Sequence, residues 1–290
     1  MPEGPEARRI AVSLNDKLAG RTLLRIEYDS RSKYRNGLPG YDEFQKYLPA
    51  RIEGVTCKGK CLLFILQSRD NQPIYCTSTL GMSGKWFVEP SSPSPHANLW
   101  FVLAETDLKL YYDDQRHFGN LALHTTAGSL TKQLGKIGPD YLLYAISLFE
   151  GLEIQEAEQI PYESWHQTLT STRWVYKQIC QFLMEPSIYS GIGNYLKSEI
   201  LYRAKIRPDR KISTLSNKDC LRLYKTILDT IYDSFRAGGL TIRDFEDPDG
   251  KTGKFNKIVY NQMHDPLGNP VQKSDFADGR TTHWVPEVQV

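Results

Sequence analysis

The sequence lacks the segments that would place a protein in or across a membrane. No apolar run reaches the ~18–20 residues that span a bilayer, and no charged-then-apolar signal sequence opens the chain. Its net charge is only +2 over 290 residues, so overall charge does not indicate a nucleic-acid binder. We therefore expect an intracellular globular protein without a membrane partner.

Cysteine is scarce, and the usual metal-ligand motifs are missing. The five cysteines form no disulfide framework and no paired C-x-x-C motifs, and none follows Cys220. The six histidines show neither H-E-x-x-H nor H-x-x-E-H spacing, which argues against a metallohydrolase. Beyond Cys220 only His264 and His283 are left, and two histidines cannot complete a four-ligand structural site. The sequence therefore predicts no bound metal and no cofactor.

Hydrophobic spacing divides the chain into a β-rich part and a helical part. Residues 5–19 carry apolar side chains at helical spacing. From about residue 22 to 124, short branched and aromatic runs alternate with turn residues, which is typical of a β-sandwich. After about residue 138 the pattern becomes helical. Amphipathic helices are expected there at 172–184, 195–202 and 218–235, followed by short β runs at 257–262 and 281–285.

These patterns predict an α+β fold in which an N-terminal helix and a two-layer β-sandwich precede a helical part and a terminal β-hairpin. The expected divisions are residues 1–130, an acidic linker at 131–164, a helical domain at 165–245, and a loop with the hairpin at 246–290. The first division has 16 basic and 14 acidic residues, the linker 2 and 6, and residues 165–290 have 18 and 14. Two mildly basic halves are compatible with a positive cleft between them.

The first six residues, Met-Pro-Glu-Gly-Pro-Glu, contain a candidate nucleophile. Removal of Met1 would leave Pro2 with a free secondary amine, and an α-amine titrates near ~8, so a useful fraction is unprotonated at neutral pH. Such an amine can attack a sugar C1′ and form an iminium, and Glu3 could then move protons. The same residues also fit an ordinary helix start, with Pro5 in the first turn. The hexapeptide alone leaves both interpretations open.

Three further motifs have the chemistry of nucleic-acid contacts, although each also fits an ordinary structural role. Lys60 leads directly into an apolar strand. Met82 lies in Leu-Gly-Met-Ser-Gly, where a flexible apolar side chain suits a gap in stacked bases. Arg116 and Phe118 provide a cation and an aromatic ring two residues apart. A solvated lysine, a core methionine and an exposed arginine beside a buried ring are the alternatives.

Two motifs in the second half favour phosphate. Ser-Gly-Ile-Gly-Asn-Tyr-Leu at 190–196 is a glycine turn that starts a helix, with Asn194 expected at the N-cap and free N–H groups beside it. Arg280 follows a glycine at the expected turn of the terminal hairpin, where a guanidinium suits bidentate phosphate recognition.

In their order along the chain, these motifs resemble those of the Fpg/Nei family of DNA glycosylases. The resemblance extends from Pro2 to about Gln289. It implies a bifunctional DNA glycosylase and AP lyase of base excision repair, which acts as a monomer on damaged DNA, duplex or single-stranded. It also implies a catalytic domain at 1–130, a helix–two-turn–helix DNA-binding domain at 165–245, and a capping loop and finger at 246–290, with DNA in the cleft. The location would be that of the DNA: nucleus, nucleoid, cytoplasm or viral factory.

The resemblance gives each motif residue a role. Pro2 matches the nucleophile that attacks C1′ before β,δ-elimination, and Glu3 matches the acid/base that helps to open the sugar. Lys60 and Arg280 complete the catalytic set, as the lysine at the lesion phosphate and the arginine that grips the flanking phosphates. The expected DNA contacts are His96, Arg116, Lys177 on a helix, and Asn194, and the residues expected to fill the gap left by a flipped nucleotide are Met82, Arg116 and Phe118.

The missing cysteines suggest a subgroup. Most of the family folds its finger around four zinc-binding cysteines, whereas this finger would be held by its own packing, through Val259, Tyr260, Val271, Phe276, Trp284 and Val285. This resembles the zincless-finger, Nei-like branch, so we expect a preference for oxidised pyrimidines and hydantoins, with a capping loop within 245–257 governing base choice. Two alternatives stay open: an oxidised-purine (8-oxoguanine or FaPy) glycosylase of the same family, and a catalytically silent damage-binding protein.

Overall fold

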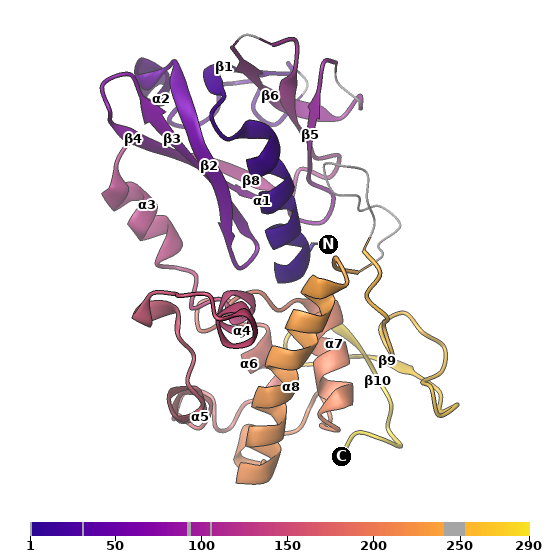
Figure 1. Cartoon of the computed structure of the whole chain (residues 1–290). Coiled ribbons are helices and arrows are strands. Elements are labelled where there is room, and N and C mark those ends of the chain that lie inside the picture. Colours follow the sequence, from indigo (N-terminus) through magenta and orange to yellow (C-terminus); the bar gives the residue numbers. More distant parts are fainter. Residues whose placement is uncertain (1, 31, 92–93, 105, 241–252) are drawn as a thin grey trace. The chain divides into compact units, whose positions relative to one another are not determined.

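The computed structural model describes residues 2–30, 32–91, 94–104, 106–240 and 253–290, which fall into two compact units (Figure 1). The first unit is formed mainly by residues 6–136, and the second by residues 3–5, 137–240 and 254–290. Glu3, Gly4 and Pro5 thus group with the second half of the chain. The division between Lys136 and Ile137 falls inside the segment expected as a linker. The domain limits given above remain a prediction.

The first unit is built on an eight-stranded antiparallel sheet with the order β5-β7-β6-β1-β2-β3-β4-β8. Strand β1 pairs with β2 only through Thr22 and Leu23, but with β6 along most of its length, so it joins the two halves of the sandwich. The strands are β1 (Thr22–Tyr28), β2 (Ala50–Lys58), β3 (Cys61–Ser68), β4 (Pro73–Thr79), β5 (Lys85–Glu89), β6 (Ala97–Leu103), β7 (Lys109–Asp113) and β8 (Asn120–His124). The helices are α1 (Gly4–Leu18), α2 (Tyr41–Phe44) with the 3-10 turn η1 (Gln45–Tyr47), and α3 (Ala127–Leu134).

The core of this unit follows from the alternation in its strands. Every second side chain of β3 beyond Leu62 is buried, as expected for a strand with one face on a core. Between the layers, the rings of Phe64, Trp86 and Phe101 meet edge to face with centroids 5.3–5.8 Å apart. The apolar face expected for residues 5–19 packs on the same core as α1, which confirms that element.

The second unit combines helices with a short hairpin. Its helices are α4 (Tyr141–Glu150), α5 (Tyr162–Leu169), α6 (Ile179–Leu183), α7 (Asn194–Arg203) and α8 (Asn217–Arg236), with 3-10 turns η2 (Glu156–Glu158) and η3 (Ile212–Thr214). Strands β9 (Gln272–Asp275) and β10 (Thr281–Trp284) pair antiparallel, and β10 lies against α7. Helix α8 begins with a capping box in which Ser216 and Asp219 bond each other's backbone N–H. Helices α4 and α5 fall at least partly within the stretch expected as an acidic linker.

The prediction of a helix at 172–184 is wrong for the first half of that range. Only Ile179–Leu183 is helical, and residues 171–176 form turns. The carbonyl oxygens of Val175 and Lys177 accept hydrogen bonds from Ser213 and Ile212 N–H, at 2.7 and 3.0 Å, so this backbone pairs with a distant segment rather than within a helix. Lys177 therefore lies on a turn and not on a helix.

The β run expected at 257–262 is also not a strand. The N–H groups of Ile258, Val259 and Tyr260 all donate to the side chain of Glu199, at 2.9–3.0 Å. A strand would offer these groups to a neighbouring strand, and here a buried carboxylate takes them instead. The run at 281–285 is confirmed as β10.

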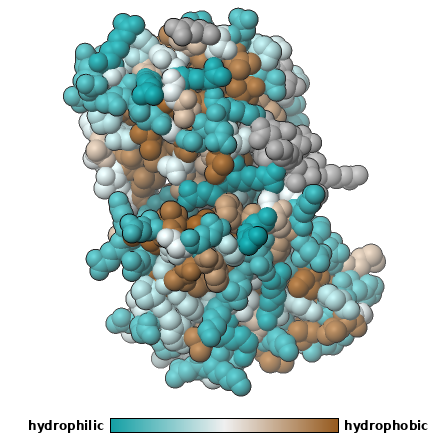
Figure 2. Space-filling model, in the orientation of Figure 1, coloured by the Kyte–Doolittle hydropathy of each residue, from teal (hydrophilic) through white to brown (hydrophobic). Residues whose placement is uncertain are grey.

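Twelve large apolar side chains are exposed among the described residues. In the view of Figure 2, brown residues gather over α4, whose Leu148 and Phe149 are about half exposed. No helix in the described part of the chain is long and apolar enough to cross a membrane.

Candidate functional site

Glu3 is buried against the start of helix α7. Its carboxylate oxygens accept hydrogen bonds from the backbone N–H groups of Gly193 (2.6 Å), Tyr195 (2.9 Å) and Leu196 (3.3 Å). The first turn of a helix leaves such donors unpaired, and its dipole favours negative charge there. Because Glu3 is only 2% exposed, these contacts fix the position of the carboxylate and stabilise its anion.

Two glycines explain how the N-terminus reaches this helix. The N–H of Gly4 donates to the carbonyl oxygen of Gly191 at 2.8 Å. A Cβ at Gly4 would lie 3.0 Å from the Gly191 Cα, and Gly191 itself has φ +105°, which favours glycine. The glycines of the N-terminal motif and of the 190–196 motif therefore permit one close backbone contact.

Pro2 is bonded directly to this fixed residue. Anchoring of Glu3 and Gly4 limits where the Pro2 nitrogen can lie once Met1 is removed. A nucleophile must be held near the reacting atom to be effective, and a held N-terminus meets this need better than a free one. The catalytic roles of Pro2 and Glu3 remain predictions.

Asn194 does not cap helix α7 as expected. It is the first residue of the helix, and the N-cap is Gly193. Glu3 takes the N–H groups that a capping side chain would satisfy, so those groups are not free for phosphate either. The Asn194 amide instead donates from Nδ2 to the carbonyl oxygen of Thr281 at 2.8 Å. The Asn194 side chain also hydrogen-bonds the side chain of Tyr260, so two partners fix its position.

Arg280 lies at the turn between β9 and β10, directly before the residue that Asn194 holds. Gly279 in this turn has φ +69°. The Arg280 side chain is exposed, and the structure gives its guanidinium no partner among the described residues. The second unit thus gathers Glu3, Asn194 and Arg280 at the N-terminal end of α7.

Met82, Arg116 and Phe118 lie on two adjoining loops of the first unit. An Arg116 guanidinium nitrogen is 4.0 Å from the Met82 sulfur. The Ser83 hydroxyl accepts from the Arg116 N–H at 3.1 Å and donates to Asp114 at 2.7 Å. Phe118 is 65% exposed and Met82 47%, although both are apolar. Exposed apolar side chains on a fixed loop are suited to a partner that covers them.

Asp114 fixes these loops, a role that the sequence motif around Arg116 did not predict. Its side chain is buried, and besides Ser83 it accepts the Gly119 N–H at 2.7 Å. Gly81 has φ +57°, and a Cβ there would lie 2.7 Å from the Gly119 nitrogen, so the two loops touch through backbone. In the sequence, the two adjacent aspartates before Arg116 could have indicated a residue that fixes the loop.

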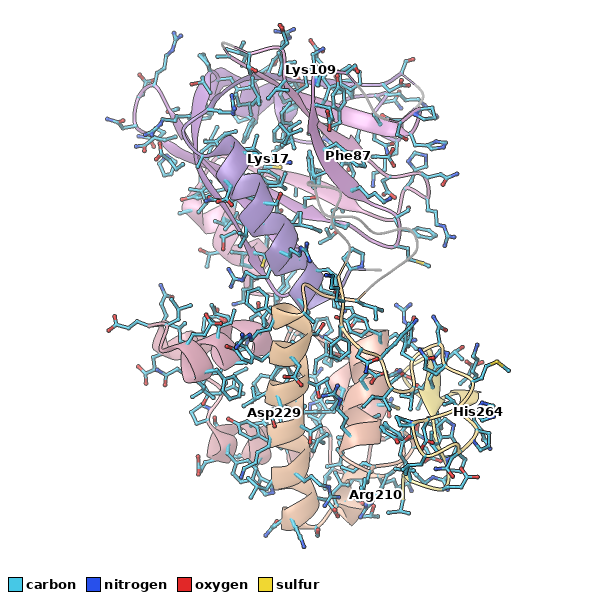
Figure 3. All side chains as sticks on the ribbon, turned by 45° about the vertical axis from the view of Figure 1, so that its right-hand side comes forward. Lys17, Phe87, Lys109, Arg210, Asp229 and His264 are labelled. Carbon is cyan, nitrogen blue, oxygen red and sulfur yellow. The ribbon has the colours of Figure 1, made fainter. Side chains whose placement is uncertain are left out.

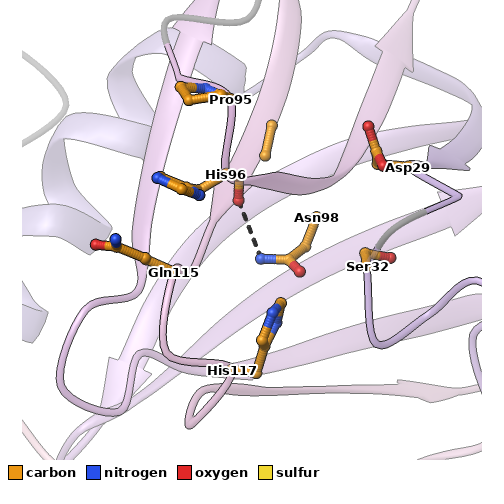
Figure 4. Close-up of a pocket in the computed structure, with 8 residues that line it drawn as sticks. Asp29, Ser32, Pro95, His96, Asn98, Gln115 and His117 are labelled. Carbon is orange, nitrogen blue, oxygen red and sulfur yellow. Dashed lines mark hydrogen bonds between the residues drawn. The ribbon is translucent and has the colours of Figure 1, made fainter.

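Lys60 and His96 also lie in the first unit. Lys60 follows Gly59 (φ +54°) in the two-residue turn between β2 and β3, so it is at a hairpin end and is half-buried. His96 precedes β6 and is exposed, and its carbonyl oxygen accepts from the Asn98 amide at 3.1 Å (Figure 4). It lines a cavity of about 250 Å³ with Asp29, Ser32, Pro95, Ala97, Asn98, Gln115 and His117.

Lys177 and the capping loop are the last of the features that the sequence predicts to act on DNA. The Lys177 ammonium lies 4.7 Å from the centre of the buried Trp174 ring, in the second unit. The capping loop expected within 245–257 lies mostly outside the described residues.

The finger has the packing expected of it at several positions. Val259 and Val285 are fully buried, and the ring of Phe276 meets that of Trp284 edge to face at 6.0 Å. The Trp284 indole N–H donates to Ser274 at 3.0 Å. In the ranges that the structure describes, no three His, Cys, Asp or Glu side chains cluster to hold a metal, and His264 is exposed beside the hairpin (Figure 3).

His283 is a buried histidine whose ring nitrogens have no hydrogen-bond partner among the residues that the structure describes. Burial, together with the charges of Lys273, Lys197 and Lys257, lowers the pKa of His283 to about 4. The ring is therefore neutral in the folded protein, whereas the unfolded chain binds a proton below about pH 6.5. Stability should rise with pH between about 4 and 6.5 and level off above, by about 2–3 kcal/mol at most.

Chemical denaturation at pH 4.5, 5.5 and 7 would measure this effect. His283→Phe should remove that part of the pH dependence, because phenylalanine can keep the 4.8 Å ring contact with Tyr260 without binding a proton. His264→Phe, at an exposed site, is the control. The prediction would be contradicted if the free energy of unfolding changed with pH equally in the wild type and in His283→Phe.

Three family models match the chain. The formamidopyrimidine-DNA glycosylase N-terminal domain matches residues 1–121, its H2TH domain residues 154–246, and its C-terminal domain residues 246–290. The formamidopyrimidine-DNA glycosylase of Exiguobacterium is 30% identical over 100% of this chain and 99% of its own length. That of Listeria monocytogenes is 29% identical over the full length of both chains.

Solved structures agree with these matches. The MutM (Fpg) protein of Thermus thermophilus superposes with a TM-score of 0.81 and 25% identity, over 99% of this chain and 98% of its own. The Lactococcus lactis Fpg, solved in complex with DNA containing an abasic site, has a TM-score of 0.82 and 26% identity, over 99% of both chains. The chain belongs to the formamidopyrimidine-DNA glycosylase family.

Proposed function

We propose that this DNA glycosylase is a bifunctional glycosylase and AP lyase that excises oxidised purines, including ring-opened formamidopyrimidines, from damaged DNA. The observation that carries the proposal is Glu3, which is fixed on the first turn of α7 next to the amine-bearing Pro2. The relatives that match the whole chain are named formamidopyrimidine-DNA glycosylases, and this supports oxidised purines over the pyrimidines and hydantoins expected from the sequence.

The proposed reaction begins with the Pro2 amine. Its lone pair forms a bond to C1′ as the C1′–N bond breaks, and the electrons of that bond leave with the base. Glu3, whose oxygens accept three N–H donors, takes the proton that the Pro2 nitrogen loses and passes it to the ring oxygen O4′ as the C1′–O4′ bond breaks. This opens the sugar and gives the iminium, whose positive charge the Glu3 carboxylate then balances. Elimination then expels the 3′ and 5′ phosphates in turn, which leaves a one-nucleotide gap.

Binding of DNA would use cations and exposed apolar side chains. Lys60, Asn194 and Arg280 are proposed to contact phosphates, and each phosphate fully neutralised by a cation steepens the log–log salt dependence of binding by about 0.9. Met82, Arg116 and Phe118 are proposed to occupy the space of the flipped nucleotide, since their loops expose apolar groups on a fixed backbone. His96 and Lys177 are proposed as further DNA contacts.

We also propose that the finger needs no zinc, as in the Nei-like zincless branch. The contacts that support this are the buried Val259 and Val285 and the ring pair of Phe276 and Trp284. Metal analysis of the purified protein should find well under one zinc per chain, and about one zinc per chain would refute the zincless finger.

Borohydride trapping tests the lyase. Correctly processed protein should form a covalent adduct with an abasic-site duplex when borohydride is present, because borohydride reduces the iminium. Pro2→Gly should lose most of this adduct, and trapping unchanged in that variant would move the nucleophile elsewhere. Absence of trapping in the wild type would favour the catalytically silent damage-binding alternative.

A lesion panel tests the choice of base. Excision from DNA containing 8-oxoguanine, a formamidopyrimidine, thymine glycol or spiroiminodihydantoin should be compared, in duplex and in single strands. The proposal expects the two purine lesions to be cut fastest in duplex. Faster excision of thymine glycol and the hydantoin would restore the preference first expected from the sequence.

A further inference from the structure

The hairpin that carries Arg280 is tied to helix α7 by a buried ion pair. The Lys197 ammonium, on α7, bonds the Asp278 carboxylate, and their side chains are 0% and 1% exposed. Taking two charges out of water costs several kcal/mol per ion, so a buried pair is often no more stabilising than two apolar side chains. Stability alone therefore does not account for an ion pair at this position.

Asp278 holds the tip of the hairpin two residues before Arg280. Its second oxygen lies 3.4 Å from the Arg280 N–H, and the Gln178 side chain accepts the Ala277 N–H at 3.1 Å. Gly279, between Asp278 and Arg280, has φ +69° and open space around it, so it imposes no restraint by packing. The Gly279 N–H donates to the Phe276 carbonyl oxygen at 2.9 Å, so hydrogen bonds at each of the residues 277–280 hold this turn.

Helix α7 also holds the strand that follows Arg280. Asn194 donates to the Thr281 carbonyl oxygen at 2.8 Å, and the Ser198 hydroxyl accepts the His283 N–H at 3.3 Å. The backbone is thus anchored on both sides of Arg280. Its guanidinium, by contrast, has no partner within the described residues, so a fixed stem presents a cation that is free to bind.

We propose that Lys197 and Asp278 are positioning residues that orient the Arg280 guanidinium toward a DNA phosphate. The inference rests on the proposed function, in which Arg280 grips phosphates at the lesion. A guanidinium binds a phosphate best through two parallel N–H donors, which demands a defined orientation. An ion pair can define that orientation where an apolar pair would not. Its hydrogen bonds hold the Asp278 carboxylate so that its second oxygen also accepts the Arg280 N–H.

The double variant Lys197→Met/Asp278→Leu separates positioning from stability. It replaces the pair with apolar side chains, which is often neutral or stabilising for the fold. We expect a Tm within a few degrees of the wild type, yet about ten-fold weaker binding of a duplex with a tetrahydrofuran abasic analogue and a log–log salt slope shallower by about 0.9, equivalent to one lost phosphate contact. The control is Lys46→Met/Glu43→Leu, at an exposed ion pair of the first unit, which should change neither the DNA binding nor its salt slope.

The same double substitution in an Arg280→Ala background is the decisive comparison. If the pair acts through Arg280, it should weaken binding less than two-fold there, since coupled residues are not additive. Equal losses in both backgrounds, or unchanged binding at a normal Tm, would overturn the inference. Should the double variant fail to fold, Asp278→Asn takes its place in both backgrounds. A wild type that forms no trapped adduct would instead refute the proposed function.

Discussion

Replacement of Glu3 with glutamine should lower single-turnover base excision by about 10²–10⁴-fold, the usual contribution of a positioned acid or base. The same variant should still form the borohydride-trapped adduct with a preformed abasic site, within about ten-fold of the wild type. An abasic sugar is already in equilibrium with its open aldehyde, so the Pro2 amine can condense with it without expelling a base. Excision, in contrast, needs a group that takes the amine proton and balances the positive sugar.

The geometry around Glu3 makes this test more specific. Both carboxylate oxygens accept N–H donors, so the NH₂ of glutamine would face at least one N–H group of α7. Glu287→Gln, at an exposed site, is the control for charge, and a thermal melt of Glu3→Gln checks that the α7 contact survives. Excision equal to that of the wild type would remove Glu3 from the reaction. Equal loss of excision and trapping would mean that Glu3 acts mainly by positioning Pro2.

Elements set by local pattern could be predicted from the sequence. The apolar faces of α1 and α8 and the alternating side chains of β3 each repeat with the period of their own structure. The two helices begin and end within one residue of the expected limits. The order of the motifs was also readable and led to the family that the comparisons support.

Contacts between distant residues could not be predicted in this way. Glu3 accepts hydrogen bonds from residues about 190 positions away, and nothing near it in the sequence names that partner. The same contact explains why Asn194 is not the N-cap of α7: the donors that a cap would satisfy are already bonded. The predictions for residues 172–178 and 257–262 were wrong for a related reason. Their side-chain patterns fit a helix and a strand, but their backbone N–H and C=O groups bond to distant residues instead of forming these elements.

Glu199 has a structural role that the sequence did not predict. It lies in α7 among buried side chains, two positions after the buried Lys197. Two opposite charges on a helix that is otherwise mostly apolar were the available signal, because charged residues are almost never fully buried unless paired. Like Glu3, Glu199 is paired with three backbone N–H groups rather than with a cation.

Glu199→Ala should lower the free energy of unfolding by about 3–5 kcal/mol, since a buried N–H left without an acceptor costs about 1–3 kcal/mol. Urea denaturation followed by tryptophan fluorescence measures the loss, with Glu287→Ala as the exposed control. Glu199→Gln should cost only about 1–2 kcal/mol. One carboxylate oxygen, Oε1, accepts from all three residues 258–260, and an amide oxygen can take its place.

The difference between these two variants is what identifies the contact. A purely electrostatic role for Glu199 would make alanine and glutamine equally harmful, because both remove the charge. An acceptor role makes glutamine mild and alanine severe, and in Glu199→Ala the amides of residues 258–260 should also exchange with deuterium much faster. These amides precede the hairpin that carries Arg280, so Glu199→Ala should weaken DNA binding as well as stability. Equal effects of the two substitutions would contradict the acceptor role.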